Sequence, residues 1–254
     1  IIEVVVERLE IKQQVFKKVE QLRKSESIIS SNTSGIPIHM MLEDRSDEFK
    51  SHFLGTHFFN PPRYLELLEI IPTQHTKPEI IDFLMMFGDR YLGKTPVLCK
   101  DTPAFIANRV GVGGILSLFH LVDKRGLSVE AIDKLTGPII GRPKSATFRT
   151  CDVVGLDTLV HVANGLFENC TKDEARESFK LPKYVQKIYD NKWLGDKTKQ
   201  GFYKKTKDEH GKKVILSLDL KTLEYKAQER VKFPSISKAK EIEDLRKRIK
   251  FLYN

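Results

Sequence analysis

The sequence predicts an α/β region followed by an all-α region. In the first hundred or so residues, short β-branched runs alternate with stretches whose apolar residues recur at helical spacing, a pattern typical of strands and helices that build one sheet. After residue 101, helical spacing dominates. The 254 residues are enough for two ordinary domains. We therefore expect a partial doubly wound, Rossmann-type sheet and a C-terminal helical domain.

The first region contains five predicted strands and two predicted helices. The strands are rich in β-branched residues and bounded by turn residues, whereas the helices carry apolar residues three and four positions apart. In chain order, the strands cover residues 1–7, 28–32, 52–59, 65–72 and 95–101, and the helices cover 9–23 and 77–92. Strand–helix–strand order favours parallel βαβ units.

The second region contains three predicted helices and a hairpin. The helices cover residues 105–124, 128–135 and 158–166, and the hairpin covers 202–218 with its turn near Glu209–Gly211. A mostly charged helical piece, Ser237–Phe251, is more typical of a linker or docking helix than of a core element. These changes in pattern divide the chain into residues 1–101, 102–205 and 206–254.

The composition argues against several classes of protein, namely membrane-spanning, metal-binding, disulfide-rich and nucleic-acid-binding proteins. With 40% hydrophobic and 30% charged residues and no apolar run of membrane-spanning length, we expect a soluble protein without a membrane span. The three cysteines form no C-x-x-C pair, so we expect neither a metal site nor a disulfide framework, and a cytoplasmic location. The net charge of +9 is spread along the chain without a nucleic-acid reading motif, so no nucleic-acid partner is predicted.

A histidine and a glutamate suggest acid–base chemistry. His57 ends a predicted strand, where α/β folds place their ligands, and Glu69 interrupts the apolar run LLEII. A buried carboxylate costs several kcal/mol unless it is paired, and an imidazole is a natural partner that the pairing would orient. Two alternatives remain open, a purely structural His57 and a Glu69 that points to solvent from an edge strand.

Two further segments carry polar residues suited to a pocket. SSNTSG places small polar side chains and a glycine directly after a strand, where they suit a ligand-contacting loop or a simple turn. DTPAFIANR places Asn108 on the first turns of a helix, where its amide can hold a carbonyl or hydroxyl, or lie on the surface. No G-x-G-x-x-G turn is present, because the nearest match, at Gly111, lies in a helical pattern.

Together these motifs resemble the L-3-hydroxyacyl-CoA dehydrogenase family of fatty-acid β-oxidation. SNTSG, GTHFFNPP, LLEIIP, CKDTPAFIANR, VGLDT and QGFYK occur in family order over about residues 1–205. The segment GPIIGRPKSATFRTCDVVGLDT looks most like the bacterial multifunctional type, in which the dehydrogenase is joined to an enoyl-CoA hydratase module. The resemblance implies an NAD-dependent oxidoreductase that converts (S)-3-hydroxyacyl-CoA to 3-oxoacyl-CoA. Residues 1–101 would then be the C-terminal part of its NAD-binding domain, residues 102–205 its helical C-terminal domain, and residues 206–254 a hairpin and basic tail.

The resemblance also assigns roles to individual residues. His57 matches the catalytic histidine and Glu69 its paired glutamate, while Ser34 and Asn108 match residues that position the substrate oxygen and the catalytic groups. The positions that resemble NAD contacts are Glu7, Lys12, Asn32, Ser34, Asn60 and Lys197. The family further implies a homodimer formed through the helical domain.

The sequence also departs from the family pattern. The glycine-rich strand–turn–helix that opens the family's NAD-binding domain is absent, so we expect a truncated chain with weak or no NAD binding and little turnover. Lys199 stands where the family usually has glycine. Alternative functions are a structural or dimerisation module of a multifunctional protein, and another β-hydroxyacid dehydrogenase, although those relatives often use a lysine as the catalytic group.

Overall fold

The computed structural model describes all 254 residues, which form two compact units. The first comprises Ile1–Gly111 with Glu168–Cys170, and the second comprises Val112–Phe167 with Thr171–Asn254. No helix combines the length and the apolar character needed to cross a bilayer. The predicted order of an α/β region followed by a mainly helical region is confirmed.

The first unit is built on a five-stranded sheet. Its order is β1 (Ile2–Glu3), β2 (Ile29–Ser31), β3 (Phe53–Phe58), β4 (Leu67–Pro72) and β5 (Thr95–Leu98). Neighbouring strands run parallel except β3 and β4, which are antiparallel. The loop between β3 and β4 contains no helix, and a parallel return would have needed a long crossover. This local reversal was not predicted, and it places two strands that carry polar residues side by side.

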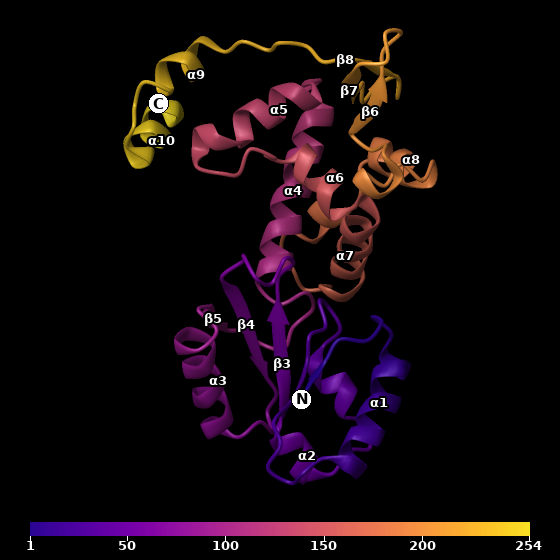
Figure 1. The fold of residues 1–254 in the computed structure, drawn as a ribbon, viewed down its shortest axis with the longest axis vertical. Coiled ribbons are helices and arrows are strands. Elements are labelled where there is room, and N and C mark those ends of the chain that lie inside the picture. The colour runs from indigo at the N-terminus through magenta and orange to yellow at the C-terminus, as the bar shows by residue number, and fades with distance from the viewer. The chain divides into compact units, whose positions relative to one another are not determined.

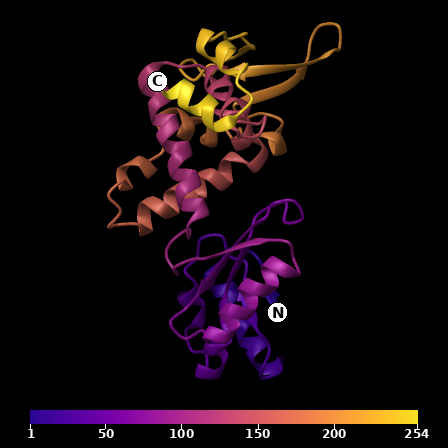
Figure 2. The same cartoon turned by 90° about the vertical axis from the view of Figure 1, so that its left-hand side faces the viewer.

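Helices cover both faces of this sheet (Figures 1 and 2). On one face lie α1 (Leu9–Leu22), the 3₁₀ turn η1 (Ile38–Leu42) and α2 (Asp47–Ser51), packed on a core that includes Phe16, Phe49 and Phe53. On the other face α3 (Pro78–Arg90) packs its Ile80 against strand residues. Because side chains alternate along a strand, successive residues of β3 and β4 serve the two cores in turn.

The first strand is shorter than predicted. Residues 1–7 were expected to be extended as one strand, but pairing stops at Glu3. The partner strand β2 ends at Ser31, and the backbone N–H of Asn32 donates the last bond, to the carbonyl of Glu3. Without a neighbour to pair with, Val4–Val6 continue only as exposed chain that turns into α1.

The second unit is mainly helical. Its helices are α4 (Ala107–Arg125, which begins in the first unit), α5 (Val129–Thr136), α6 (Phe148–Val154), α7 (Leu156–Asn169) and α8 (Lys183–Asp190). The aromatic rings of Phe119 and Phe148 stack at its centre, and the ring of Phe202 packs against both at steep angles. Helices α6 and α8 were not predicted, because they are short and their apolar residues do not cover two full turns.

The C-terminal part departs from the predicted single helix. The predicted hairpin is present as β6 (Tyr203–Lys207) and β7 (Lys213–Leu218), and β8 (Tyr225–Ala227) adds a third strand. The predicted helix 237–251 is two helices, α9 (Pro234–Ala239) and α10 (Leu245–Tyr253), because Asp244 accepts the Lys247 N–H and starts a new helix. Ile236 is buried against Ile139, so α9 contributes to the core of its unit.

Candidate active site

His57 and Glu69 face each other across the antiparallel pair β3 and β4. They are register partners, and His57 Nδ1 lies 2.7 Å from Glu69 Oε2. Both residues are buried, with 3% and 1% of their surface exposed. Because the carboxylate holds Nδ1, Nε2 is the ring nitrogen left to exchange a proton. The expected pairing is therefore confirmed, and a solvent-facing Glu69 on an edge strand is wrong, since β4 lies inside the sheet.

The second oxygen of Glu69 is held by the start of α4. Oε1 accepts the backbone N–H of Ile106 at 3.0 Å and that of Ala107 at 2.8 Å. Burial alone would raise the pKa of Glu69, but the hydrogen bond from His57, the Ala107 amide, the charge on His57 and the Ile106 amide outweigh it and hold that pKa below its usual range. Glu69 is thus kept ionised beside the imidazole, which stabilises the ring when it takes up a proton.

The loop after β2 is fixed from two sides. Glu7 Oε1 accepts the Thr33 hydroxyl at 2.5 Å and the Ser34 N–H at 2.9 Å, and the Asn108 amide donates to the Ser34 carbonyl at 2.9 Å. Asn108 follows directly after Ala107, the residue that donates to Glu69. The structure therefore brings Ser34 and Asn108 together, with the backbone of Ser34 as the point of contact and its side chain exposed.

Lys12 is the most enclosed cation of the first unit. Only 1% of its surface is exposed. Its ammonium contacts Glu3 at 2.9 and 3.0 Å, Glu7 at 3.2 Å and the Val5 carbonyl at 3.4 Å. An ammonium has three N–H donors, so these acceptors use all of them. Lys12 thus lies beside the predicted cofactor residue Glu7, with its charge directed into the protein.

The other predicted cofactor residues lie in different settings. Asn32 Oδ1 accepts the Phe58 N–H at 2.9 Å, which ties the end of β2 to the end of β3. Asn60 is exposed in the loop after β3, where it forms a cis bond to Pro61. Lys197 belongs to the second unit, where its ammonium lies 2.5 Å from Asp157 Oδ1. The cluster of the first unit therefore includes Asn32 but not Lys197.

Sequence reasoning missed Glu3 and the backbone donors. Glu3 accepts the Lys12 ammonium and, at 2.6 Å, the hydroxyl of Ser31. Its position in the apolar run IIEVVV carries the same signal as Glu69 in LLEII, a carboxylate among apolar residues that must find a partner. The N–H groups of Ile106 and Ala107 carry no such signal, because any residue type supplies them.

The family-like motifs of the second unit have structural roles. The buried Asp152 accepts the N–H groups of Phe202 and Tyr203, both at 2.8 Å, and burial raises its pKa to about 6. A side chain at Gly201 would collide with Asp152, which explains the glycine of QGFYK. Lys199 has a left-handed φ of 59°. The glycine that the resembling family usually has at this position would adopt that conformation with less strain.

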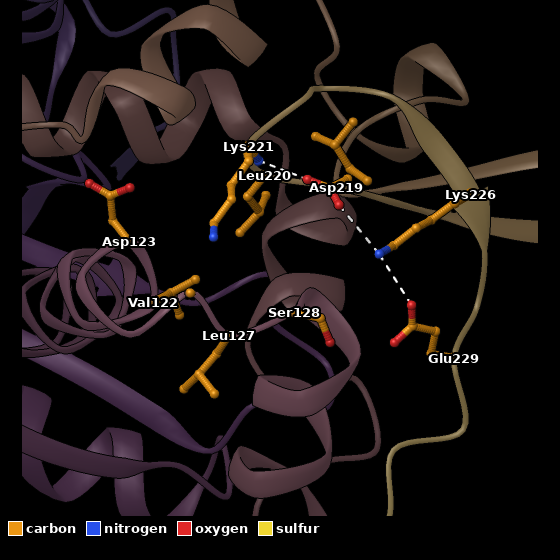
Figure 3. A pocket seen from close by; sticks show the side chains of 11 residues that line it. Val122, Asp123, Leu127, Ser128, Asp219, Leu220, Lys221, Lys226 and Glu229 are labelled. Atoms are coloured by element: carbon orange, nitrogen blue, oxygen red, sulfur yellow. Dashed lines mark hydrogen bonds and ion pairs between the residues drawn. The ribbon is translucent and has the colours of Figure 1, made fainter.

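A pocket of about 260 Å³ in the second unit is not a better candidate for the active site than the cluster around His57 and Glu69 (Figure 3). It lies where the turn between α4 and α5 meets the chain after β7. The Lys226 ammonium there is 3.3 Å from Asp219 and 3.2 Å from Glu229, so its charge is already balanced. The candidate active site is therefore the cluster around His57 and Glu69.

Comparison with known families agrees with the motifs. The family model "3-hydroxyacyl-CoA dehydrogenase, NAD binding domain" matches residues 1–102. The model "3-hydroxyacyl-CoA dehydrogenase, C-terminal domain" matches residues 105–205. Together the two models cover most of the chain, so the resemblance predicted from the motifs is confirmed.

Three individual proteins show the extent of the similarity. A "Probable 3-hydroxyacyl-CoA dehydrogenase" of Bacillus subtilis is 50% identical over 99% of this chain, which spans 31% of that protein. A "Putative fatty acid oxidation complex trifunctional enzyme" of Rickettsia felis is 37% identical over 91% of this chain and 32% of its own length. The crystal structure of M. tuberculosis FadB2 matches with a TM-score of 0.72 and 31% identity over 80% of this chain and 69% of its own. The chain thus spans about a third of the two longer relatives.

The enclosed ammonium of Lys12 gives a stability prediction. Replacing Lys12 by Met leaves Glu3 and Glu7 without their counter-charge, and breaking a buried ion pair costs about 3–5 kcal/mol. We expect Lys12→Met to lower the free energy of unfolding by that order in urea denaturation. Lys17→Met, at an exposed position of the same helix, is the control and should change it by no more than about 0.5 kcal/mol. Equal effects of the two substitutions would contradict the enclosed role of Lys12.

The lowered pKa of Glu69 gives a pH prediction. A carboxylate whose pKa is lower in the folded state stabilises the fold above its ordinary value of 4.5 and loses this contribution as the pH falls through the folded pKa. The Glu69→Gln variant lacks this contribution. Its urea midpoint should therefore fall less steeply than that of the unsubstituted protein as the pH decreases below 4.5. Parallel curves for the two proteins over this range would argue against the ionised Glu69.

Proposed function

The chain belongs to the 3-hydroxyacyl-CoA dehydrogenase family, and we propose that the protein catalyses the NAD-dependent oxidation of (S)-3-hydroxyacyl-CoA to 3-oxoacyl-CoA in fatty-acid β-oxidation. The observation that carries the proposal is the buried His57–Glu69 pair, whose carboxylate is held on its other side by two backbone N–H groups. Such a pair suits the transfer of one proton to and from a substrate hydroxyl.

In the oxidative direction, His57 acts as the general base. Its Nε2 takes the proton of the substrate 3-hydroxyl, and Glu69 stabilises the imidazolium through Nδ1. When bound, NAD supplies the acceptor for the hydride that leaves C3. In the reverse direction, the imidazolium returns the proton to the oxygen. The ring centroids of Phe59 and Phe105 lie 4.4 and 5.7 Å from that of the imidazole, and only 3% of the surface of His57 is exposed, so little water reaches the ring.

The substrate oxygen would be positioned by the loop after β2. Asn108 holds the Ser34 carbonyl, and the exposed Ser34 side chain is left to contact the substrate. We place the nicotinamide end of NAD against the half-exposed Glu7 and the Asn32–Ser34 loop, which fit it because polar groups gather there at the carboxyl ends of β1 and β2. The glycine-rich turn that holds a pyrophosphate in such domains is not among these 254 residues.

The remaining predicted cofactor residues differ in how they could contact NAD. Lys12 would act through Glu7, because its own donors are all occupied. We propose Asn60 as a cofactor contact, because it is exposed in the loop after β3. We also propose Lys197 as a cofactor contact, with Asp157 as a competing partner for its ammonium. In this proposal, residues 1–101 form part of the NAD-binding domain, 102–205 the helical C-terminal domain, and 206–254 a hairpin and tail.

The larger context is also part of the proposal. A protein about three times as long as this chain, like the two longer relatives, has room for an enoyl-CoA hydratase module that would supply the hydroxyacyl substrate by hydration. Three buried cysteines without a disulfide suit the cytoplasm. A dehydrogenase for small hydroxy acids is disfavoured, because a His–Glu pair stands where those relatives often use a lysine.

Replacement of His57 tests the function directly. We expect the native protein that carries these residues to oxidise NADH with acetoacetyl-CoA, and His57→Ala to lower kcat by a factor on the order of 10²–10⁴. His75→Ala, at an exposed loop position of the same unit, should leave the rate unchanged. NADH absorbance follows the reaction. A His57→Ala rate close to that of the His75→Ala control would remove His57 from its role as general base.

We further propose that the protein is a homodimer formed through its helical domain. Leu121, Val153 and Val154 of the second unit expose large apolar side chains, at 43%, 58% and 56%, and a second copy would remove them from water. Sedimentation velocity of the native protein should give twice the mass of one chain. A single species of monomer mass at micromolar concentration would refute the dimer and leave the dehydrogenase proposal untouched.

A further inference from the structure

The two N–H groups that hold Glu69 come from a strained loop. Between β5 and α4 the chain takes left-handed conformations at two successive residues, Ala104 with φ 59° and Phe105 with φ 51°. For residues other than glycine, each such conformation costs about 1–2 kcal/mol. Directly after them, Ile106 and Ala107 direct their N–H groups to Glu69 Oε1. The conformation persists only if contacts on the loop outweigh its cost.

Asp101 supplies such a contact at the start of the same loop. Its Oδ1 accepts the Ile38 N–H at 2.6 Å, and its Oδ2 accepts the His39 N–H at 2.8 Å. Oδ2 also lies 2.7 Å from His39 Nδ1. The Asp101 side chain is only 12% exposed, whereas that of His39 is 63% exposed. The bond from the Ile38 N–H is therefore the better protected part of this contact, whereas both contacts with His39 are exposed.

The residue that Asp101 holds packs beneath the strand of His57. Ile38 is fully buried, and its Cδ1 lies 2.7 Å from where a Cβ on Gly55 would be. Gly55 precedes His57 by two residues on β3, so both face the same side of the sheet. Through Ile38, Asp101 thus connects the loop that holds Glu69 to the side chains packed against β3, the strand that carries His57.

We propose that Asp101 is a positioning residue of the dehydrogenase, which anchors the Asp101–Ala107 loop to η1 so that Ile106 and Ala107 hold Glu69 against His57. This role rests on the proposed function. Asp101 contacts neither Glu69 nor His57 in the hydrogen-bond network, and it acts through the loop backbone. The thiol of Cys99, which also faces Glu69, has a pKa raised by burial to about 12 and stays neutral at working pH.

The test compares Asp101→Asn with His39→Ala in the native protein that carries these residues. Asn has the size of Asp but only one acceptor oxygen, so one backbone bond is lost and the loop shifts. We expect kcat of Asp101→Asn to fall on the order of 10- to 10²-fold, with little change in KM. His39→Ala keeps both backbone bonds and removes only an exposed pair, so its kcat should match that of the unsubstituted protein.

Two further readouts separate positioning from a general loss of stability. Weaker N–H bonds would let the pKa of Glu69 rise. In the reductive direction His57 is needed as the imidazolium, and protonation of Glu69 is what lowers the rate, so the acid limb of the kcat profile of Asp101→Asn in that direction should move to higher pH. Amide hydrogen exchange at Ile106 and Ala107 should also speed up, and this readout needs no activity. Unchanged kcat, acid limb and exchange rates would overturn the proposal.

The outcomes also distinguish this proposal from the function on which it rests. An unsubstituted protein without dehydrogenase activity would refute the function, while exchange at Ile106 and Ala107 would still report on the anchor. If Asp101→Asn does not fold, Asp101→Glu keeps the charge and moves the acceptors by one methylene. It should then show the same lowered kcat and faster exchange, and wild-type values of both would overturn the anchor.

Discussion

The first unit is organised around one buried charge, the carboxylate of Glu69. An isolated carboxylate in a protein interior costs many kcal/mol, so its neighbours must supply both a counter-group and hydrogen bonds. Here the counter-group comes from β3 through His57, and the hydrogen bonds come from the start of α4 through Ile106 and Ala107. One side chain thereby requires a strand and a helix terminus to meet at a defined distance.

The need to satisfy Glu69 extends through neighbouring contacts to the opposite edge of the sheet. Ala107 precedes Asn108, which donates to the Ser34 carbonyl, and the Ser34 N–H donates to Glu7. Glu7 in turn pairs with the enclosed Lys12. These contacts connect β3, β4 and the start of α4 with the segments that follow β2 and β1, so Ser34, Asn108, Glu7 and Lys12 share one network with the His57–Glu69 pair.

The free-energy cost of burying a charged side chain predicted much of this arrangement, but not the register of the strands. The free-energy cost of burying Glu69 among leucines and isoleucines predicted a partner, and His57, at the end of the preceding predicted strand, was the imidazole chosen for that role. The antiparallel return from β3 to β4, which makes the two residues register partners, depends on how the strands pair and carried no local signal. The position of Lys197 beside Asp157 was likewise unpredictable, because contacts between distant segments are set by tertiary packing.

Burial of a carboxylate alone does not identify a catalytic group, and the structure contains three cases that show why. Asp152 is satisfied by the backbone of Phe202 and Tyr203, an arrangement that can only fix the chain. Glu3 faces Lys12, whose ammonium is enclosed and has no route to a ligand. Glu69 alone among the three faces an imidazole, a group that can take up and return a proton and that keeps a second nitrogen free of the carboxylate. The chemistry is therefore assigned by the partner of the buried charge, and the same criterion separates a structural carboxylate from a catalytic one wherever both occur in one chain.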